Sequence, residues 1–310
     1  MKRHRGLVAA GIAGAAVAAV LVAAWVAAPP VGNLQGRLAA REHATGATGL
    51  PLARIAPVMR NAIVATEDER FFQNHGIDLL GIARAIPYDL SHFSFAQGAS
   101  TITDQLAKLL YLGGNDHSPW RKLQDLALSL KISTRYSKDE VLAAYLDSAY
   151  FGNGAYGVDA AARGYFGVPA ARLSLAQASL LAGLVQAPSA YDPVAHPLAA
   201  RWRQVDVLRS LVRDGYATPH EAEAVLARPL PLRGSRALPA LRGVKVASLP
   251  AFALGRRAVG VALFFGAVAV FLALRRRVGG RRLFVYGLRA AFTVALLAGA
   301  VTITSSINAL

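Results

Sequence analysis

Residues 137–149, SKDEVLAAYLDSA, carry the signals of one complete helix. Ser137 and Glu140 form the pattern of a capping box, in which each side chain bonds the other residue's backbone N–H at a helix start. Val141 and Tyr145 follow four residues apart, a spacing that puts apolar side chains on one face of a helix. The stretch therefore predicts a helix that begins after Ser137 and buries one side.

The same signals recur along the chain. Ser174 with Gln177 and Thr218 with Glu221 repeat the capping box. Ser118-Pro119 combines a helix cap with proline at the first helical position. Residues 151–157 are glycine-rich and predict a loop, and no long run alternates apolar and polar residues as a strand would. The pattern predicts an all-α domain.

Composition narrows the class of protein. The 310-residue chain is 54% hydrophobic and 17% charged, which is too apolar for a disordered protein. It has no cysteine, which excludes disulfide frameworks, thiolate metal sites and cysteine nucleophiles. The net charge of +16 arises mainly in residues 224–310, which hold thirteen Lys or Arg and no acid. Those arginines flank apolar segments, so we expect membrane contact and no nucleic-acid binding.

Three apolar segments approach the length of about twenty residues that a membrane span requires. They are residues 7–28, 258–274 and 283–307. The first has the alternative of a signal peptide, but it exceeds the usual apolar core of about 7–15 residues, which favours a retained anchor. Basic residues precede it and five arginines lie within 275–282, and such clusters mark cytoplasmic flanks. We therefore expect the body of the chain outside the cytoplasm.

These features divide the chain into six expected parts. They are a cytoplasmic tip and transmembrane anchor (1–28), the main helical domain (29–230), a linker (231–257), a transmembrane helix (258–274), a cytoplasmic basic loop (275–282) and a last transmembrane helix (283–307).

Polar stretches in the main domain are candidates for chemistry. Glu67 and Asp68 belong to a run of three acids before two aromatics, for which a solvated helix end is the plain alternative. Thr101, Gln105 and Lys108 are spaced by four and three residues, so on one helix they would share a face that suits an anionic, oxygen-rich ligand.

A third stretch places Arg121 and Lys122 ahead of Asp125, again on one helix face. An ordinary surface ion pair, worth a few tenths of a kcal/mol, is the alternative here. Each of the three stretches alone is weak evidence for a site.

In their order and spacing, five stretches resemble the motifs of the peptidoglycan glycosyltransferases, glycosyltransferase family 51. Residues 67–76 are similar to EDxxFxxHxG, 98–109 to GxSTITQQLxKN and 121–125 to RKxxE. Residues 138–167 and 180–193 resemble the fourth and fifth motifs. The likeness covers about residues 52–227 and implies a lysozyme-like helical fold. No SxxK or KTG motif is present, which indicates a monofunctional transglycosylase without a transpeptidase domain.

The resemblance implies polymerisation of lipid II into glycan strands, by inverting transfer to the 4-hydroxyl of N-acetylglucosamine with undecaprenyl pyrophosphate leaving. Glu67 and Asp125 are the implied catalytic residues. The implied substrate-binding residues are Asp68, Phe71, Ser100, Thr101, Gln105, Lys108, Arg121 and Lys122. No metal site or tightly bound cofactor is implied, and a divalent cation is an option. The implied partners are lipid II, the growing strand, the lipid bilayer and other cell-wall synthesis proteins, at the extracytoplasmic face of the bacterial plasma membrane.

The chain departs from the family pattern at several positions. Asp125 stands in place of a glutamate and Asn74 in place of a histidine. Asp104 replaces a glutamine four residues before Lys108, so we expect an ion pair that competes with phosphate for that ammonium. The further departures are Leu109 for asparagine, Ala143 for glutamate, Asp147 for asparagine and Gln177 for glutamate.

Two other functions stay open because of these departures. A degenerate family member would bind lipid II or a cell-wall partner with weak or no catalysis. A hydrolase of the lysozyme type would place two carboxylates around a sugar bond, but it would have no need of cations that face phosphate.

Overall fold

The computed structural model describes residues 2–78, 81, 100–112 and 118–246 of the chain. Nearly all of them belong to one compact unit, residues 1–78 and 100–248. A second unit, residues 79–99 and 249–310, lies outside the described residues apart from Gly81. The two expected C-terminal spans and the basic loop between them therefore lie outside the described residues.

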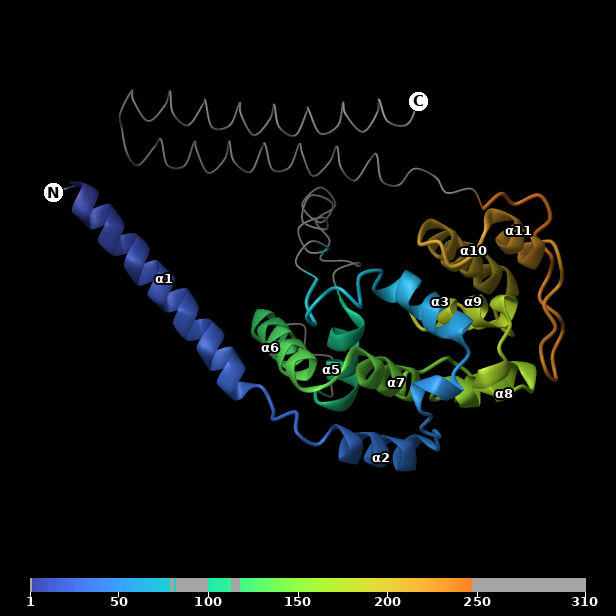
Figure 1. Cartoon of the computed structure of the whole chain (residues 1–310), viewed down its shortest axis with the longest axis horizontal. Helices are drawn as coiled ribbons and strands as arrows, with labels where there is room; N and C mark the ends of the chain where they lie inside the picture. The colour runs from blue at the N-terminus through green and yellow to red at the C-terminus, as the bar shows by residue number, and fades with distance from the viewer. Residues whose placement is uncertain (1, 79–80, 82–99, 113–117, 247–310) are drawn as a thin grey trace, which may run out of the picture. The chain divides into compact units, whose positions relative to one another are not determined.

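The main domain is built from helices, as predicted (Figure 1). Within the described residues, β-structure is limited to two isolated bridges, Tyr150 with Tyr156 and Leu230 with Leu238. The helices are α1 (Lys2–Ala27), α2 (Leu34–Thr45), α3 (Pro57–Glu67), α5 (Ile102–Leu110), α6 (Pro119–Arg135), α7 (Lys138–Ser148), α8 (Val158–Phe166), α9 (Leu175–Leu184), α10 (Pro197–Arg213) and α11 (Pro219–Leu226), with short 3-10 turns at Leu52–Arg54 and Ala170–Arg172.

Helix starts follow the predicted caps. The Ser137, Ser174 and Thr218 side chains cap α7, α9 and α11, and each helix completes its capping box. Ser118 caps α6 ahead of Pro119. A side-chain cap supplies an acceptor to an otherwise unpaired backbone N–H and stabilises a helix start by about 1 kcal/mol.

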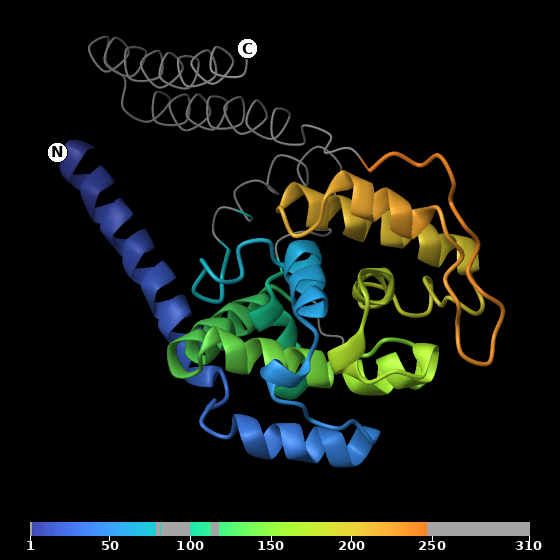
Figure 2. The same ribbon diagram turned by 45° about the vertical axis from the view of Figure 1, so that its right-hand side comes forward.

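Two groups of helices make up the core. In one, α9 packs against α3 and α10, and in the other, α5 packs against α6 and α7 (Figures 1 and 2). Residues 178–184 of α9 are all buried, because this helix is apolar on every side and neighbours cover it all round. The packing fixes the end of α3 and the start of α5, which carry the first two motifs.

Residues 231–246, expected as part of a linker, pack onto the helical domain. Leu238 and Val246 are fully buried, and the Arg233 N–H donates to the Tyr165 carbonyl at 2.8 Å. Arg201 on α10 is also fully buried, and its guanidinium donates to backbone carbonyls that include those of Leu226 and Pro239. These contacts hold the chain against the domain beyond residue 230.

The first expected span coincides with α1, a helix of 26 residues. Its C-terminal end lies against α6, where the Lys131 ammonium donates to the Ala28 carbonyl at 2.7 Å and stands 5.2 Å from the Trp25 ring centre. Side chains of α1 are described from residue 14 onward, except at 17. Among the residues so described, no helix of the protein has both the length and the apolarity to cross a membrane. The three spans stay predictions.

Candidate active site

Glu67 is the last residue of α3 and is held from two other helices. The Gln105 side-chain amide on α5 donates to Glu67 Oε2 at 2.8 Å. The Tyr145 hydroxyl on α7 in turn donates to Gln105 Oε1 at 2.7 Å. Because the Tyr145 hydroxyl binds the amide oxygen of Gln105, the amide nitrogen faces the Glu67 carboxylate. Glu67 is thereby oriented by three helices.

Burial raises the pKa of Glu67 above its ordinary value of 4.5. The Gln105 hydrogen bond and the positive charge of Arg203 oppose that rise without cancelling it. A carboxylate with a raised pKa accepts a proton more readily near neutral pH than a solvated glutamate does. Glu67 therefore has the properties of a general base.

Asp68, the next residue, points into the protein. It is 7% exposed and accepts hydrogen bonds from the Asn74 amide at 2.9 Å and from the Ile102 N–H at 3.2 Å. Asn74 also accepts from the Lys138 ammonium at 3.0 Å. Asn74, which stands where the family motif has a histidine, thus makes a polar contact with this acid. Asp68 joins the end of α3 to the start of α5.

Thr101 and Phe71, which were expected to bind substrate, make contacts within the protein. The spacing predicted one helix face for Thr101, Gln105 and Lys108, but α5 begins at Ile102, and Thr101 is its cap. The Thr101 hydroxyl donates to the Gly76 carbonyl at 2.7 Å and accepts from the Asp104 N–H at 3.1 Å. Phe71 is completely buried, with the Lys138 ammonium 4.3 Å from its ring centre. The shared helix face therefore reduces to Gln105 and Lys108, and Ser100 directly precedes the cap.

Asp104 contacts two of the three candidate phosphate-binding cations. Its Oδ2 lies 2.8 Å from the Lys108 ammonium and 3.4 Å from that of Lys122. The expected ion pair with Lys108 is confirmed, and the contact with Lys122 on α6 is an addition to it. Asp104 is only 3% exposed, whereas the two lysine side chains are 40% and 49% exposed. The buried carboxylate of Asp104 therefore contacts two lysines, Lys108 and Lys122, whose side chains are partly open to solvent.

Asp125 completes the cluster from α6. Its Oδ1 lies 3.5 Å from Arg121 Nε and its Oδ2 lies 3.8 Å from the Lys108 ammonium, both longer than good charged hydrogen bonds. Burial and the neighbouring negative charge of Asp104 raise the pKa of Asp125. The Arg121 guanidinium also donates to the Leu112 carbonyl. Two buried acids thus stand among three cations.

The sequence patterns missed two residues near Glu67. Tyr145 lies in the apolar stripe of residues 141–149 and was expected to be core. Arg203 on α10 acts on Glu67 by its charge, and its Nε is 3.4 Å from the Gly183 carbonyl. A single arginine in a helix carries no spacing signal, so only the fold could place it beside Glu67.

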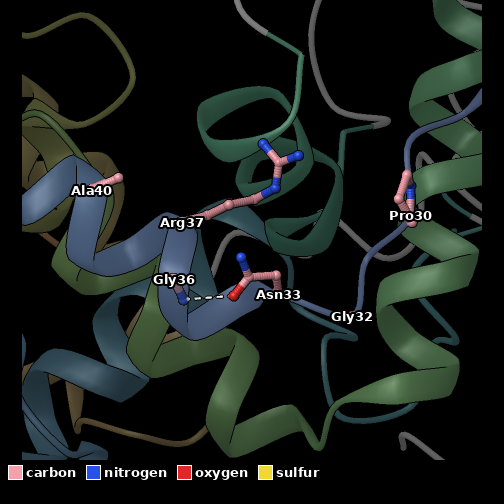
Figure 3. Close-up of a pocket in the computed structure, with 6 residues that line it drawn as sticks. All are labelled: Pro30, Gly32, Asn33, Gly36, Arg37 and Ala40. Atoms are coloured by element: carbon pink, nitrogen blue, oxygen red, sulfur yellow. Dashed lines mark hydrogen bonds between the residues drawn. The ribbon is translucent and has the colours of Figure 1, made fainter.

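Within the described residues, the predicted site residues neither form a metal-binding cluster nor line the hollow shown in Figure 3. Within the part of the chain that the structure describes, no cluster of three or more His, Asp or Glu side chains is arranged to hold a metal ion. A hollow of about 430 Å³ at the junction of α1 and α2 is lined by Pro30, Gly32, Asn33, Gly36, Arg37 and Ala40 (Figure 3). It contains none of the predicted site residues.

Known proteins resemble this chain over the residues that build the site. The family model described as Transglycosylase matches residues 35–212. A protein of Cupriavidus necator that is assigned as a transglycosylase is 44% identical over 184 residues, which make up 59% of this chain and 79% of that protein.

Two longer relatives are penicillin-binding proteins. Penicillin-binding protein 2D of Bacillus subtilis is 39% identical over 181 residues, 58% of this chain and 26% of its own length. Penicillin-binding protein 1A of Aquifex aeolicus is 42% identical over 173 residues, 56% of this chain and 24% of its own length. The chain thus matches about a quarter of the length of each.

The raised pKa of Glu67 predicts a pH-dependent stability cost. A carboxyl whose pKa is higher in the folded than in the unfolded protein stabilises the fold below the unfolded pKa and loses that contribution as pH rises through the folded pKa. Glu67→Gln removes the titration and keeps an acceptor for Gln105. We therefore expect the variant to melt higher than the unsubstituted protein at pH 8, with the difference disappearing near pH 4.

Glu140→Gln is the matched control for this melting series. Hydrogen bonds from Ser137 lower the pKa of Glu140, so its loss should reduce stability at pH 8 and have little effect at low pH. A Glu67→Gln variant that is less stable than the unsubstituted protein at pH 8 would contradict the assigned environment of Glu67.

Proposed function

Because the chain belongs to the transglycosylase family, we propose that it is a peptidoglycan glycosyltransferase that polymerises lipid II. One observation carries the proposal: a partly buried, oriented Glu67 carboxylate contacts α5 one turn before Lys108, which lies in a cluster with Arg121 and Lys122. A base next to cations is what displacement of a pyrophosphate by a hydroxyl requires. The order of the sequence motifs supports the same activity.

In the proposed reaction Glu67 accepts the proton of the 4-hydroxyl of the incoming lipid II. The hydroxyl oxygen forms a bond to the anomeric carbon of the growing strand as the bond to undecaprenyl pyrophosphate breaks. The electron pair of that bond leaves on the pyrophosphate, which Lys108, Arg121 and Lys122 stabilise. The α-linked pyrophosphate becomes a β-1,4 linkage by inversion.

Asp125 and Ser100 have supporting roles in this proposal. Asp125 orients Lys108 and Arg121 by its charge, and Ser100 lies at the start of α5 near the incoming substrate. A divalent ion would add positive charge at the pyrophosphate if the substrate carried it. No step of the proposed reaction requires a metal held by the protein.

A second candidate function is binding without efficient catalysis. It is favoured by Asp104, a buried acid that contacts both Lys108 and Lys122 and stands where the family pattern has glutamine. A protein of this kind would bind lipid II and form no glycan polymer. Activity and binding measured on the same sample separate the two functions.

We also propose a location for the reaction. The apolar N-terminal segment anchors the chain in the plasma membrane, and the helical domain works on the extracytoplasmic face. The basic flanks of the expected spans support this orientation. The bilayer and other cell-wall synthesis proteins would then be its partners.

The first test addresses the base. Glu67→Gln keeps the size and the hydrogen bond of the side chain but removes the proton acceptor, so polymerisation of labelled lipid II should fall by about 10²–10⁴-fold. Binding of lipid II should persist. Glu223→Gln, on the remote helix α11, is the matched control and should polymerise normally. Polymerisation by Glu67→Gln at the unsubstituted rate would refute the assigned role.

The second test addresses the internal carboxylate. Asp104→Gln frees Lys108 and Lys122 for the pyrophosphate, and partly exposed ion pairs are worth about 0.2–1 kcal/mol. The apparent KM for lipid II should therefore fall by about two- to fivefold in steady-state assays. Asp206→Asn, which removes an exposed acid from α10, controls for net charge. An unchanged or raised KM in Asp104→Gln would show that Asp104 does not compete with substrate.

The third test addresses topology. A reporter that is active only outside the cytoplasm should be active when fused after Gly243 and silent when inserted between Arg277 and Arg281. The opposite pattern would place the helical domain on the cytoplasmic side, where strand polymerisation into the wall cannot occur.

A further inference from the structure

A groove separate from the candidate active site lies between α2 and α7. Its volume is about 460 Å³, and the segment 49–52 lines it together with the two helices. The groove residues are Gln35, Leu38 and Glu42 from α2, Gly49 to Leu52 from the connecting segment, and Asp139, Glu140, Ala143, Ala144 and Asp147 from α7. The lining combines apolar side chains with four acidic ones.

Four carboxylates line this groove without a basic partner. Within the described residues, none of Glu42, Asp139, Glu140 and Asp147 forms an ion pair with a lysine or arginine. The chain as a whole has a net charge of +16, and no basic residue lines the groove. Uncompensated negative charge at one place on so basic a protein attracts a cationic ligand.

Asp147 is the carboxylate whose environment is incomplete. It is 7% exposed, and its Oδ2 accepts a hydrogen bond from the Leu50 N–H at 3.0 Å. Its Oδ1 is buried and has no hydrogen-bond partner. A buried acceptor without a donor destabilises the fold, and a donor that enters the groove would offset that cost. Burial, together with the carboxylates of Glu42 and Asp159, raises the pKa of Asp147 to about 7.

The sequence also sets this groove apart from the family pattern. Two of the departures in the fourth motif, Ala143 for glutamate and Asp147 for asparagine, lie four residues apart and line the groove together. The first shortens a side chain beside the groove, and the second adds a negative charge. Neither residue contributes to the proposed glycosyl transfer.

We propose that this groove docks a segment of a partner protein that presents an arginine or lysine side chain beside apolar ones. A guanidinium carries several donors in a plane and pairs well with carboxylates, while Leu38, Leu50 and Leu52 offer apolar surface to its neighbours. The groove is large enough for side chains and is not arranged as a metal site in the described residues. The inference is independent of the proposed enzymatic activity.

The test uses the purified full chain in detergent and two labelled peptides. One is acetyl-Leu-Arg-Ala-Leu-Arg-Leu-amide, and the other carries citrulline, the neutral isostere, in place of both arginines. Fluorescence anisotropy should show the arginine peptide binding about tenfold or more tightly than the citrulline peptide. Asp147→Asn retains an acceptor for the Leu50 N–H, and Glu42→Gln removes a second charge; each should weaken arginine-peptide binding severalfold.

Asp206→Asn, which removes an exposed acid from α10, should leave peptide binding unchanged. Binding to the unsubstituted chain should also weaken as pH falls from 8 to 6, and Asp147→Asn should remove most of that change. Equal binding of the two peptides, or undiminished binding in both groove variants, would overturn the proposal. N-acetyl-arginine amide binding as tightly as the peptide would overturn it in favour of a small-amine site, and self-association that Asp147→Asn abolishes would overturn it in favour of a second copy of the chain.

Discussion

The hydrogen bond from the Gln105 amide to the Glu67 carboxylate is the contact on which the site depends. It joins the end of α3 to α5 at 2.8 Å, and the Tyr145 hydroxyl on α7 fixes the amide from the other side. Without this donor, only the charge of Arg203 would oppose the effect of burial, and the pKa of Glu67 would rise further. The bond therefore sets both the position and the basicity of the carboxylate. Because α3 and α5 belong to different packed groups, the same bond links the two halves of the core.

In the proposed function, the cationic cluster binds the pyrophosphate and Asp104 limits that binding. A surface that attracts pyrophosphate also attracts any carboxylate within reach, and Asp104 lies one helical turn from Lys108. An acid that already orients the cations reduces the conformational entropy that their side chains lose when a ligand binds. This is the benefit of such an arrangement. In the proposed reaction, the cost is competition between Asp104 and the pyrophosphate for the same cations. The buried position of Asp104 and the partial exposure of both lysines leave their outer sides available to a ligand.

Local signals predicted the helices well, because capping boxes and apolar stripes act within a few residues. They predicted the Asp104–Lys108 pair for the same reason, since the pair spans one turn. They could not predict that Lys122, on another helix, contacts Asp104, nor that the charge of Arg203 acts on Glu67, because both depend on packing. Thr101 was misplaced by a single residue at the helix start. Phe71 and Tyr145 show the remaining difficulty, since core and site aromatics have the same spacing.

Two of the three aspartates that depart from the family pattern, Asp104 and Asp125, belong to one cluster and are best understood together. Asp125 is one methylene shorter than the family's glutamate and lies 3.5 and 3.8 Å from its cations, too far for strong hydrogen bonds. Asp104 adds a carboxylate to the same cluster and makes the closer contact with Lys108, at 2.8 Å. The shorter side chain of Asp125 leaves its negative charge farther from the cations. Asp104 supplies negative charge to the same cations at a shorter distance. Burial and the negative charge of Asp104 together raise the pKa of Asp125. Since the two residues share Lys108, the effect of changing either one depends on which residue occupies the other position.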